Sequence, residues 1–276
     1  MRAAWPILLL ILAWPAAGAP AAAPPDPYPD VASAYWVEVD GLPVWAGQPE
    51  RRLPMASLAK LMTALLIAEG GDLDAVVTVS AAAAAETGAR LGLRRGERVR
   101  AGDLLTAALV RSANDACRAL ADWRPGGQAS FVLRMNQRAR QMQLVNTHFA
   151  DACGHDAATQ YSSARDLARL ARSAMRQAPI AAAVAKRKFA FKSLDGTAHS
   201  MRATNALLAG LPGTRGIKTG YTPGAGRCIV ALVERDGVEV LAVLLHAPDR
   251  WWDSAGLIEL AFKRAGATRS QPAVAR

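Results

Sequence analysis

Hydrophobic and polar residues are arranged differently at the two ends of the chain and in its middle. Near the ends lie short β-rich stretches, at residues 35–39, 42–45, 215–221, 227–233 and 238–245. Asp40-Gly41 separates the first two stretches and Asp236-Gly237 the last two, and Asp-Gly between strands favours a tight hairpin turn. We therefore expect one antiparallel sheet built from both chain ends, with the N-terminal hairpin at its edge.

The middle of the chain is rich in alanine and leucine, in patterns that favour helices. Helices are expected from Ser57 onward and at residues 101–123, 127–144, 162–176 and 251–265. The segment 101–123 is expected to be a helix pair or a broken helix. Residues 186–192 alternate basic and apolar side chains, which predicts a strand with one basic face. After the Asp195-Gly196 turn, residues 199–202 can pair back on this strand. The expected fold class is α+β: an antiparallel sheet flanked by helices, with an inserted helical subdomain.

The first residues predict an export signal. A short basic start precedes an apolar run from Ile7 to Trp14, and small residues and prolines follow. This run is shorter than the roughly 20 residues that span a bilayer, and no later segment is long and apolar enough to do so. We expect a signal peptide and leader over residues 1–23, a single domain over 24–266 and a short tail over 267–276. The alternative is a leader that is not removed and tethers the chain to a membrane.

The composition narrows the classes of function. The formal net charge is +10, and the basic residues comprise 27 Arg and 6 Lys. Most Arg residues stand singly along expected helices, and the one dense basic cluster, at residues 186–192, alternates as a strand does, so nucleic-acid binding is disfavoured. The charge instead suits an exported protein that meets an anionic polymer of the cell envelope.

The three cysteines, Cys117, Cys153 and Cys228, do not have the spacing of a zinc site. An exported chain can form a disulfide, but an odd number leaves one thiol over. We favour three small buried apolar side chains. Neither a metal nor a cofactor is expected.

Candidate chemistry starts in the apolar helix, where Ser57 and Lys60 are three positions apart. That spacing puts both side chains on one helix face. Burial lowers the pKa of a lysine toward neutrality, so Lys60 can serve as the base that takes the proton of the Ser57 hydroxyl. Backbone N–H groups at a helix start can also stabilise an oxyanion. Taken alone, however, the pair favours a capping serine and a lysine that reaches solvent.

Two further motifs follow along the chain. Ser112 and Asn114 come after an apolar run and can both reach into a cleft from a turn between helices. Lys218, Thr219 and Gly220 lie on an expected strand, along which an extended peptide can form main-chain hydrogen bonds. Helix capping and a strand-end lysine are the simpler interpretations, but chance is a poor explanation for all three motifs in this order.

Together these motifs resemble those of the serine D-alanyl-D-alanine carboxypeptidases, the low-molecular-mass penicillin-binding proteins. The likeness extends from about residue 32 to 262 and includes the segments 94–99, 114–117, 147–151, 163–167 and 218–226. It implies a β-lactamase/transpeptidase-like fold and a periplasmic enzyme of peptidoglycan biosynthesis, cell wall and cell shape. The implied partners are peptidoglycan pentapeptide stems, which lose their terminal D-alanine, and β-lactams such as penicillin, which act as acylating inhibitors.

The resemblance also implies catalytic roles. Ser57 would attack the carbonyl of the penultimate D-alanine, with Lys60 as its base. Ser112 and Asn114 would relay protons and orient the substrate amide. The backbone N–H groups of Ser57 and Tyr221 would form the oxyanion hole.

Substrate binding is assigned in the same way. Lys218 and Thr219 would hold the terminal carboxylate, and Gly220 and Tyr221 would belong to the strand along which the peptide lies. Arg250, near the final helix, is a further candidate for carboxylate binding. A solvated arginine at a helix start is the alternative.

The chain departs from the family in one respect. Many members carry a second, β-rich domain and a C-terminal anchor, whereas the residues after 265 are too few and too polar for either. Because short members of the wider family can cut peptide cross-links, D,D-endopeptidase activity is an alternative, as is a catalytically silent cell-wall binder. A β-lactamase is disfavoured, since no glutamate lies between Glu97 and Glu234 to serve as the deacylating base of a class A enzyme.

Overall fold

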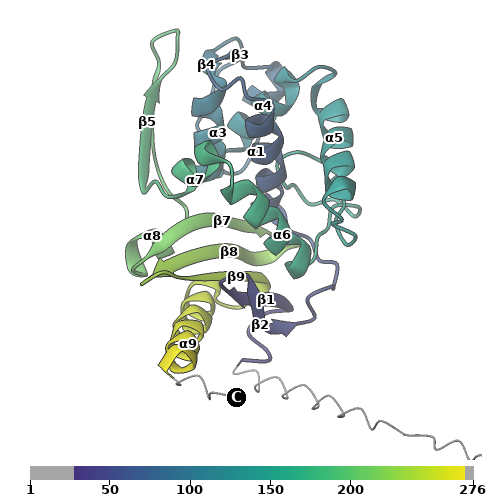
Figure 1. Cartoon of the computed structure of the whole chain (residues 1–276). Coiled ribbons are helices and arrows are strands. Elements are labelled where there is room, and N and C mark those ends of the chain that lie inside the picture. The colour runs from purple at the N-terminus through teal and green to yellow at the C-terminus, as the bar shows by residue number, and fades with distance from the viewer. Residues whose placement is uncertain (1–27, 271–276) are drawn as a thin grey trace, which may run out of the picture.

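An antiparallel sheet joins the two ends of the chain, as the sequence predicted. The computed structural model describes residues 28–270, with side chains to residue 267, so the expected leader lies outside the described residues. The sheet order is β2-β1-β9-β8-β7 (Figure 1). The strands are β1 (Ala34–Val39), β2 (Leu42–Gly47), β7 (Thr214–Thr222), β8 (Gly226–Arg235) and β9 (Val238–Ala247).

Two turns set the register of this sheet. Asp40 and Gly41 have φ of 49° and 81°, and Asp236 and Gly237 have φ of 49° and 70°. Both central residues of each turn are therefore in the left-handed region, which a tight hairpin of this kind requires and which Asp-Gly tolerates. The turns pair β1 with β2 and β8 with β9, while β1 pairs with β9 to close the two chain ends together.

Helices cover both faces of the sheet (Figure 1). Most of them lie on one face and form the inserted helical part, and α9 (Arg250–Ser270) packs on the other. The remaining helices are α1 (Lys60–Glu69), α2 (Ala81–Ala84), α3 (Ala101–Val110), α4 (Asn114–Trp123), α5 (Gly127–Gln141), α6 (Ala164–Met175), α7 (Ala178–Val184) and α8 (Leu207–Gly210). Two small hairpins complete the fold: β3 (Val76–Thr78) with β4 (Arg98–Arg100), and β5 (Lys188–Lys192) with β6 (Ala198–Arg202).

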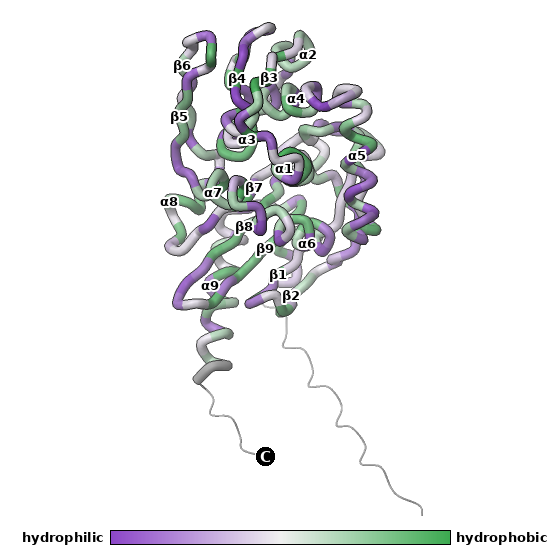
Figure 2. The backbone as a smooth tube through the Cα atoms, turned by 45° about the horizontal axis from the view of Figure 1, so that its top comes forward, coloured by the Kyte–Doolittle hydropathy of each residue, from purple (hydrophilic) through white to green (hydrophobic). Residues whose placement is uncertain are grey.

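The α1 helix lies at the centre of the helical part, which explains its apolar sequence. It packs against α3, α4, α5, α6 and α7, and Figure 2 shows it end-on among its neighbours. Seven of its ten residues are buried. A helix that is apolar on all sides is stable only when other elements cover it on all sides. The neighbours of α1 provide this cover.

Some helix boundaries differ from the sequence prediction, and the helix expected over residues 127–144 ends at Gln141. The helix expected from Ser57 begins instead as a 3-10 turn, η1 (Ala56–Ala59), and becomes α-helical at Lys60. At the C-terminus α9 continues to Ser270, whereas its end was expected near Ala265, so it enters the segment expected as a short tail. None of the described helices is both long and apolar enough to cross a bilayer.

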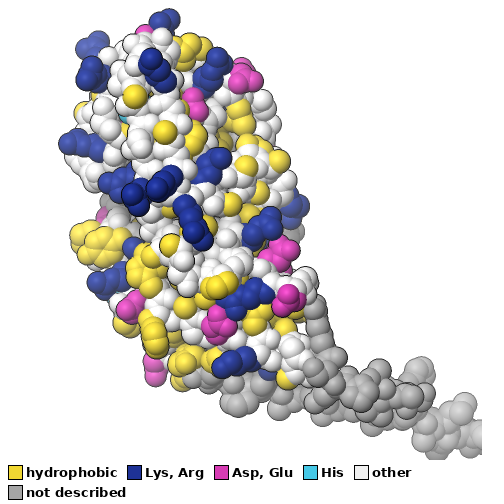
Figure 3. Space-filling view, turned by 90° about the vertical axis from the view of Figure 1, so that its left-hand side faces the viewer, with side chains coloured by type: hydrophobic (Ala, Val, Ile, Leu, Met, Phe, Trp, Pro, Cys, Tyr) yellow, Lys and Arg dark blue, Asp and Glu magenta, His cyan; other side chains and the backbone are white. Residues whose placement is uncertain are grey.

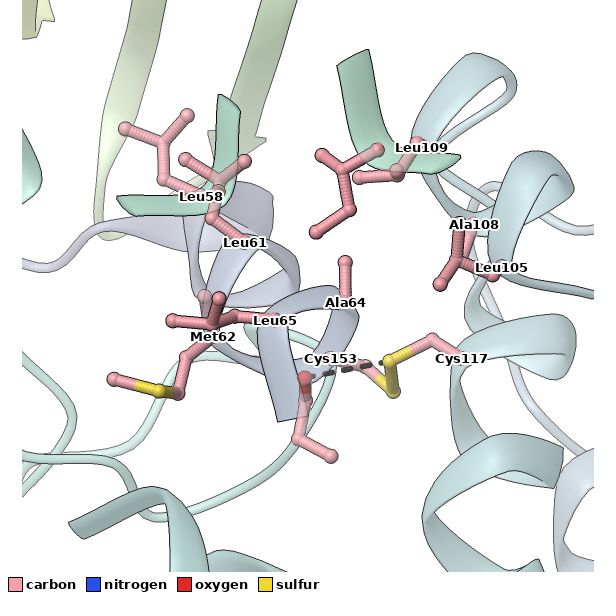
Figure 4. Close-up of a cluster of buried hydrophobic side chains, with 14 of the residues drawn as sticks. Leu58, Leu61, Met62, Ala64, Leu65, Leu105, Ala108, Leu109, Cys117 and Cys153 are labelled. Carbon is pink, nitrogen blue, oxygen red and sulfur yellow. Dashed lines mark hydrogen bonds between the residues drawn. A yellow bond between two sulfur atoms is a disulfide. The ribbon is translucent and has the colours of Figure 1, made fainter. Parts of the chain in front are cut away.

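The expectation of three unpaired cysteines is wrong for two of them. Cys117 on α4 and Cys153 form a disulfide, and only Cys228 is a buried free thiol. Figure 4 shows the disulfide beside the apolar side chains of α1 and α3. The residues are 36 positions apart, and sequence spacing alone could not show that α4 meets the loop between α5 and α6.

Replacing Cys117 and Cys153 together by alanine is expected to lower the free energy of unfolding by about 2 to 4 kcal/mol, because the cross-link restricts the unfolded chain. Urea denaturation without reductant measures this loss. Cys228→Ala is the control: dithiothreitol should destabilise the wild type and this variant but leave the double variant unchanged. Equal responses of all three proteins would contradict the cross-link.

Candidate active site

Residues of all three sequence motifs meet in one cleft of about 420 Å³ between the sheet edge and the helical part. Its lining includes Ser57, Ser112, Asn114, Thr219, Gly220, Tyr221 and Arg250. Another hollow of about 310 Å³, between α6 and the sheet, is lined by neither a serine nor a lysine. The chemistry of the side chains therefore selects the larger cleft as the candidate active site.

Ser57 is presented to this cleft by the η1 turn. Its neighbours Ala56 and Leu58 are buried, while Ser57 itself keeps some exposed surface. Ala56 has φ of 48°, an unusual value for a residue with a side chain. Such strain is held in place by surrounding structure and occurs often at functional sites. Here it accompanies a turn that points one hydroxyl outward from an otherwise apolar segment.

Lys60 is buried beneath Ser57, with an exposed fraction of 1%. Its Nζ lies 3.0 Å from Ser57 Oγ, 2.7 Å from Asn114 Oδ1 and 2.5 Å from the Cys153 carbonyl oxygen. Burial lowers the pKa of Lys60 to about 7, against the opposing effect of nearby carboxylates, of which Asp151 is the strongest. Near neutral pH a substantial fraction of this lysine is therefore unprotonated and can accept a proton from Ser57.

Ser112 lies in the turn between α3 and α4, as the sequence suggested. It is buried and has φ of 62°, so its backbone is in the left-handed region. Asn114 is the first residue of α4, and its side chain joins two segments: Oδ1 accepts from Lys60, while Nδ2 donates to the Thr87 carbonyl at 2.7 Å. The simple capping interpretation is excluded for α4, because Ala113 is its N-cap and makes no side-chain cap.

Lys218 on the edge strand β7 is also buried, with an exposed fraction of 1%. Its Nζ donates to Ser112 Oγ at 2.8 Å and to the Thr219 carbonyl at 2.8 Å. Burial, with the positive charges of Lys60 and Arg250, holds the pKa of Lys218 well below its ordinary value. Ser112 Oγ therefore accepts a hydrogen bond from the buried amine of Lys218. The second buried amine, that of Lys60, lies near enough to lower the pKa of Lys218.

Gly220 allows β7 to pass close to the serine. A Cβ at this position would lie 3.0 Å from the Met55 carbonyl oxygen and 3.2 Å from the Ser57 nitrogen. Tyr221 follows at the exposed rim of the cleft. Arg250, at the start of α9, donates from Nη1 to the Gly220 carbonyl at 2.6 Å and is half-buried. Its position in the cleft wall does not fit the alternative of a solvated arginine.

Sequence reasoning missed the loop that closes the opposite wall, residues 151–160. Asp151 Oδ1 accepts from the backbone N–H groups of Cys153 and Gly154, and His155 Nε2 lies 2.8 Å from a Glu86 carboxylate oxygen. Asp156 accepts from Thr222 and so clasps the loop to the end of β7. The contacts of His155 with Glu86 and of Asp156 with Thr222 join residues 69 and 66 positions apart, and no local motif signals them.

One prediction concerns pH. The value of kcat/KM for a soluble peptide substrate is expected to rise with pH through about 7, because Lys60 must be neutral to accept a proton. Below that pH the rate should fall about tenfold per pH unit. Asp151→Asn removes a negative charge that raises the pKa of Lys60, so the rise should move to lower pH. A profile that is flat across neutrality, or a shift to higher pH in the variant, would contradict this assignment.

The geometry defines a class of site. A partly exposed serine hydroxyl beside a buried amine of lowered pKa, with further buried cationic groups at a sheet edge, can take up an acyl group and bind a carboxylate. No group of described residues has the make-up of a metal site.

The comparisons agree with this class. Residues 23–249 match the peptidase family S11, D-alanyl-D-alanine carboxypeptidase, and the chain belongs to this family. It is 34% identical to D-alanyl-D-alanine carboxypeptidase DacD of Escherichia coli over 81% of this chain and 60% of that protein. It is 32% identical to a D-alanyl-D-alanine endopeptidase of Pseudomonas aeruginosa over 75% of this chain and 68% of that protein.

A solved structure supports the α+β fold. The DD-transpeptidase of Streptomyces K15 superposes with a TM-score of 0.80 at 28% identity, over 84% of this chain and 97% of that one. The chain spans about three fifths of the length of curated relatives such as DacD.

Proposed function

We propose that the protein is a serine D-Ala-D-Ala carboxypeptidase that removes the terminal D-alanine from peptidoglycan pentapeptide stems through an acyl-enzyme on Ser57. The observation that carries the proposal is the buried Lys60 Nζ, 3.0 Å from Ser57 Oγ, with a pKa lowered to about 7. Membership of the carboxypeptidase family supports the substrate class.

Acylation begins when neutral Lys60 takes the Ser57 proton. Ser57 Oγ forms a bond to the carbonyl carbon of the penultimate D-alanine, and the carbonyl oxygen becomes an oxyanion held by the backbone N–H groups of Ser57 and Tyr221. The C–N bond then breaks, and the terminal D-alanine leaves with a proton that reaches its amine from Lys60 through Ser112. Asn114 holds Lys60 in place by accepting from its Nζ and orients the substrate amide.

The terminal carboxylate is bound at the sheet edge. The Lys218 amine and the Thr219 hydroxyl would donate hydrogen bonds to it, and Arg250 would add a cation at the cleft wall. Gly220 lets β7 lie close to the backbone around Ser57, and because β7 is an edge strand the peptide backbone can lie along it. Because the carboxylate is bound this close to Ser57, the site would select peptides in which only one residue follows the bond to be cut.

In deacylation a water oxygen attacks the ester carbonyl while neutral Lys60 takes one of its protons, the bond from the acyl carbon to Ser57 Oγ breaks, and Lys60 returns a proton to that oxygen. The products are the shortened stem with a free carboxylate and the restored Ser57 hydroxyl. Penicillin would acylate the same serine, because its strained amide is attacked as the peptide is. Because no glutamate lies between Glu97 and Glu234 to serve as the deacylating base of a class A β-lactamase, the penicillin adduct would be hydrolysed slowly and the drug would act as an inhibitor.

The location follows from the substrate. A leader over residues 1–23 would export the chain to the periplasm, where it would act in cell-wall biogenesis and cell shape. Residues 24–266 would form the catalytic domain.

D-alanine release from a soluble pentapeptide ending in D-Ala-D-Ala tests the proposal, with a cross-linked peptide dimer as the second substrate. Release from the pentapeptide at a higher kcat/KM supports the carboxypeptidase. Preferential cleavage of the dimer would favour the endopeptidase, for which the Pseudomonas aeruginosa relative is the argument. A folded chain that cleaves neither substrate and is not acylated by penicillin would instead be a silent cell-wall binder.

A further inference from the structure

The β5–β6 hairpin carries an exposed basic surface next to the cleft. Lys188, Lys192 and Arg202 are exposed on its outer side, and Lys186 and Arg187 precede it in the chain. We call these five residues the basic hairpin face. None of them forms an ion pair with any residue that the structure describes. Figure 3 looks onto this side of the molecule and shows Lys and Arg side chains recurring over it, with most of the acidic side chains in the lower half of the view.

The pairing of the two strands places like charges together. Lys188 lies directly opposite Arg202 in the antiparallel register. Like charges in such a pair destabilise a hairpin, and an anion bound between them removes the repulsion. The remaining outward positions carry small side chains, Ala190, Ala198 and Ser200, so no acidic group of the hairpin offsets the charge there.

The inner side of the hairpin is firmly held, so its outer side is presented in a fixed orientation. Phe191 stacks on His199, and His199 Nε2 lies 2.7 Å from a Glu97 oxygen in a buried contact. At the tip, Asp195 binds Arg98 at 2.9 Å. The acidic residue at the tip is thereby occupied by a cation of β4 and does not neutralise Lys192.

The basic hairpin face is continuous with the candidate active site. Two residues after Arg202, Thr204 lines the cleft, and its Oγ1 lies 3.1 Å from Thr219 Oγ1. The Thr204 N–H donates to the Val110 carbonyl, which precedes the exposed Arg111 and then Ser112. A polymer bound in the cleft that continues past Thr204 therefore meets the basic hairpin face.

We propose that the basic hairpin face binds the carboxylates of the peptidoglycan strand whose stem peptide occupies the cleft. The inference rests on the proposed function. Its basis is charge complementarity between five unpaired cations and a carboxylate-bearing polymer, together with continuity between the hairpin and the cleft. An anionic membrane is disfavoured as the partner, because the outward positions between the cations carry small side chains and Leu194 at the tip is the one large apolar side chain exposed on the hairpin.

The test compares two triple variants that remove the same charge. The first combines Lys188→Ser, Lys192→Ser and Arg202→Ser on the basic hairpin face. The control combines Arg51→Ser, Arg140→Ser and Lys263→Ser, which are exposed elsewhere. Co-sedimentation with purified peptidoglycan sacculi measures binding to the polymer, phosphatidylglycerol vesicles measure binding to a membrane, and a soluble pentapeptide measures the catalytic site alone.

The hairpin variant should bind sacculi about tenfold more weakly than the wild type, and its binding should depend less on salt. Its kcat/KM for the soluble pentapeptide should stay within about twofold of the wild-type value, since none of the three residues lines the cleft. An equal loss in the control variant, unchanged binding to sacculi, or a loss confined to vesicles would overturn the proposal. Failure of the wild type on the soluble pentapeptide would instead refute the proposed function.

Discussion

Replacing Lys60 by alanine is expected to lower kcat/KM for D-alanine release by about a thousandfold or more, because Ser57 then has no base within reach. Ser57→Ala should remove the activity altogether. Acylation by penicillin should be lost in parallel, since it uses the same proton transfer. The measurement is D-alanine released from a soluble pentapeptide, with labelled penicillin as the second readout.

The controls separate chemistry from folding. Lys60→Met keeps the volume of the buried stem, so a folded Lys60→Met protein should be as inactive as the alanine variant. Lys263→Ala removes an exposed lysine on α9 and should leave the rate unchanged. A Lys60→Met protein that still reacts with penicillin at the wild-type rate would rule out Lys60 as the base.

The second large effect is expected at Gly154. This residue has φ of 93°, and a Cβ here would lie 2.1 Å from the Ala56 carbonyl oxygen and 2.7 Å from the Ser57 nitrogen. Both contacts are with backbone, which cannot turn aside as a flexible side chain can. Gly154→Ala should therefore displace η1 or the 151–160 loop. We expect a fall in kcat/KM of about a hundredfold, with about 2 to 4 kcal/mol of lost stability.

A second glycine supplies the matched control. Gly71 has a similar φ of 79°, but nothing lies within 4 Å of the Cβ that Gly71→Ala would add. This variant carries the backbone strain without the contact, so it should lose about 1 to 2 kcal/mol of stability and no activity. Kinetics on the soluble pentapeptide, with urea denaturation of both variants, distinguish the two effects. Equal kinetics in the two variants would show that the 151–160 loop does not position Ser57.

The fold was predictable where a local pattern carries its own physical reason. Asp-Gly turns determine hairpins within a few residues, so both hairpins of the sheet were expected at the observed positions. The helix expected at residues 162–176 is α6, and Ser163 is its observed N-cap. The alternation of residues 186–192 predicted a strand with one basic face, and β5 has this pattern.

The site was predictable only in its motif residues. The spacing of Ser57 and Lys60 places them one turn apart in a helix of any kind. Ser112 and Asn114 are two positions apart, so a short turn after α3 keeps them close together. Local geometry does not reveal that Cys153 and Asn114 supply two of the three hydrogen bonds to Lys60, because these partners lie 93 and 54 positions away. The contact between His155 and Glu86, 69 positions apart, was equally invisible.

The sequence by itself determined the strands, the turns, the apolar central helix and the order of three motifs, because each depends on residues that are near neighbours in the chain. Only the tertiary structure decided that Lys60 is buried to the point where its pKa falls to about 7, that Cys117 meets Cys153, and that the β5–β6 hairpin adjoins the cleft. Burial, cross-linking and charge arrangement depend on segments far apart in the sequence, and packing alone brings those segments together.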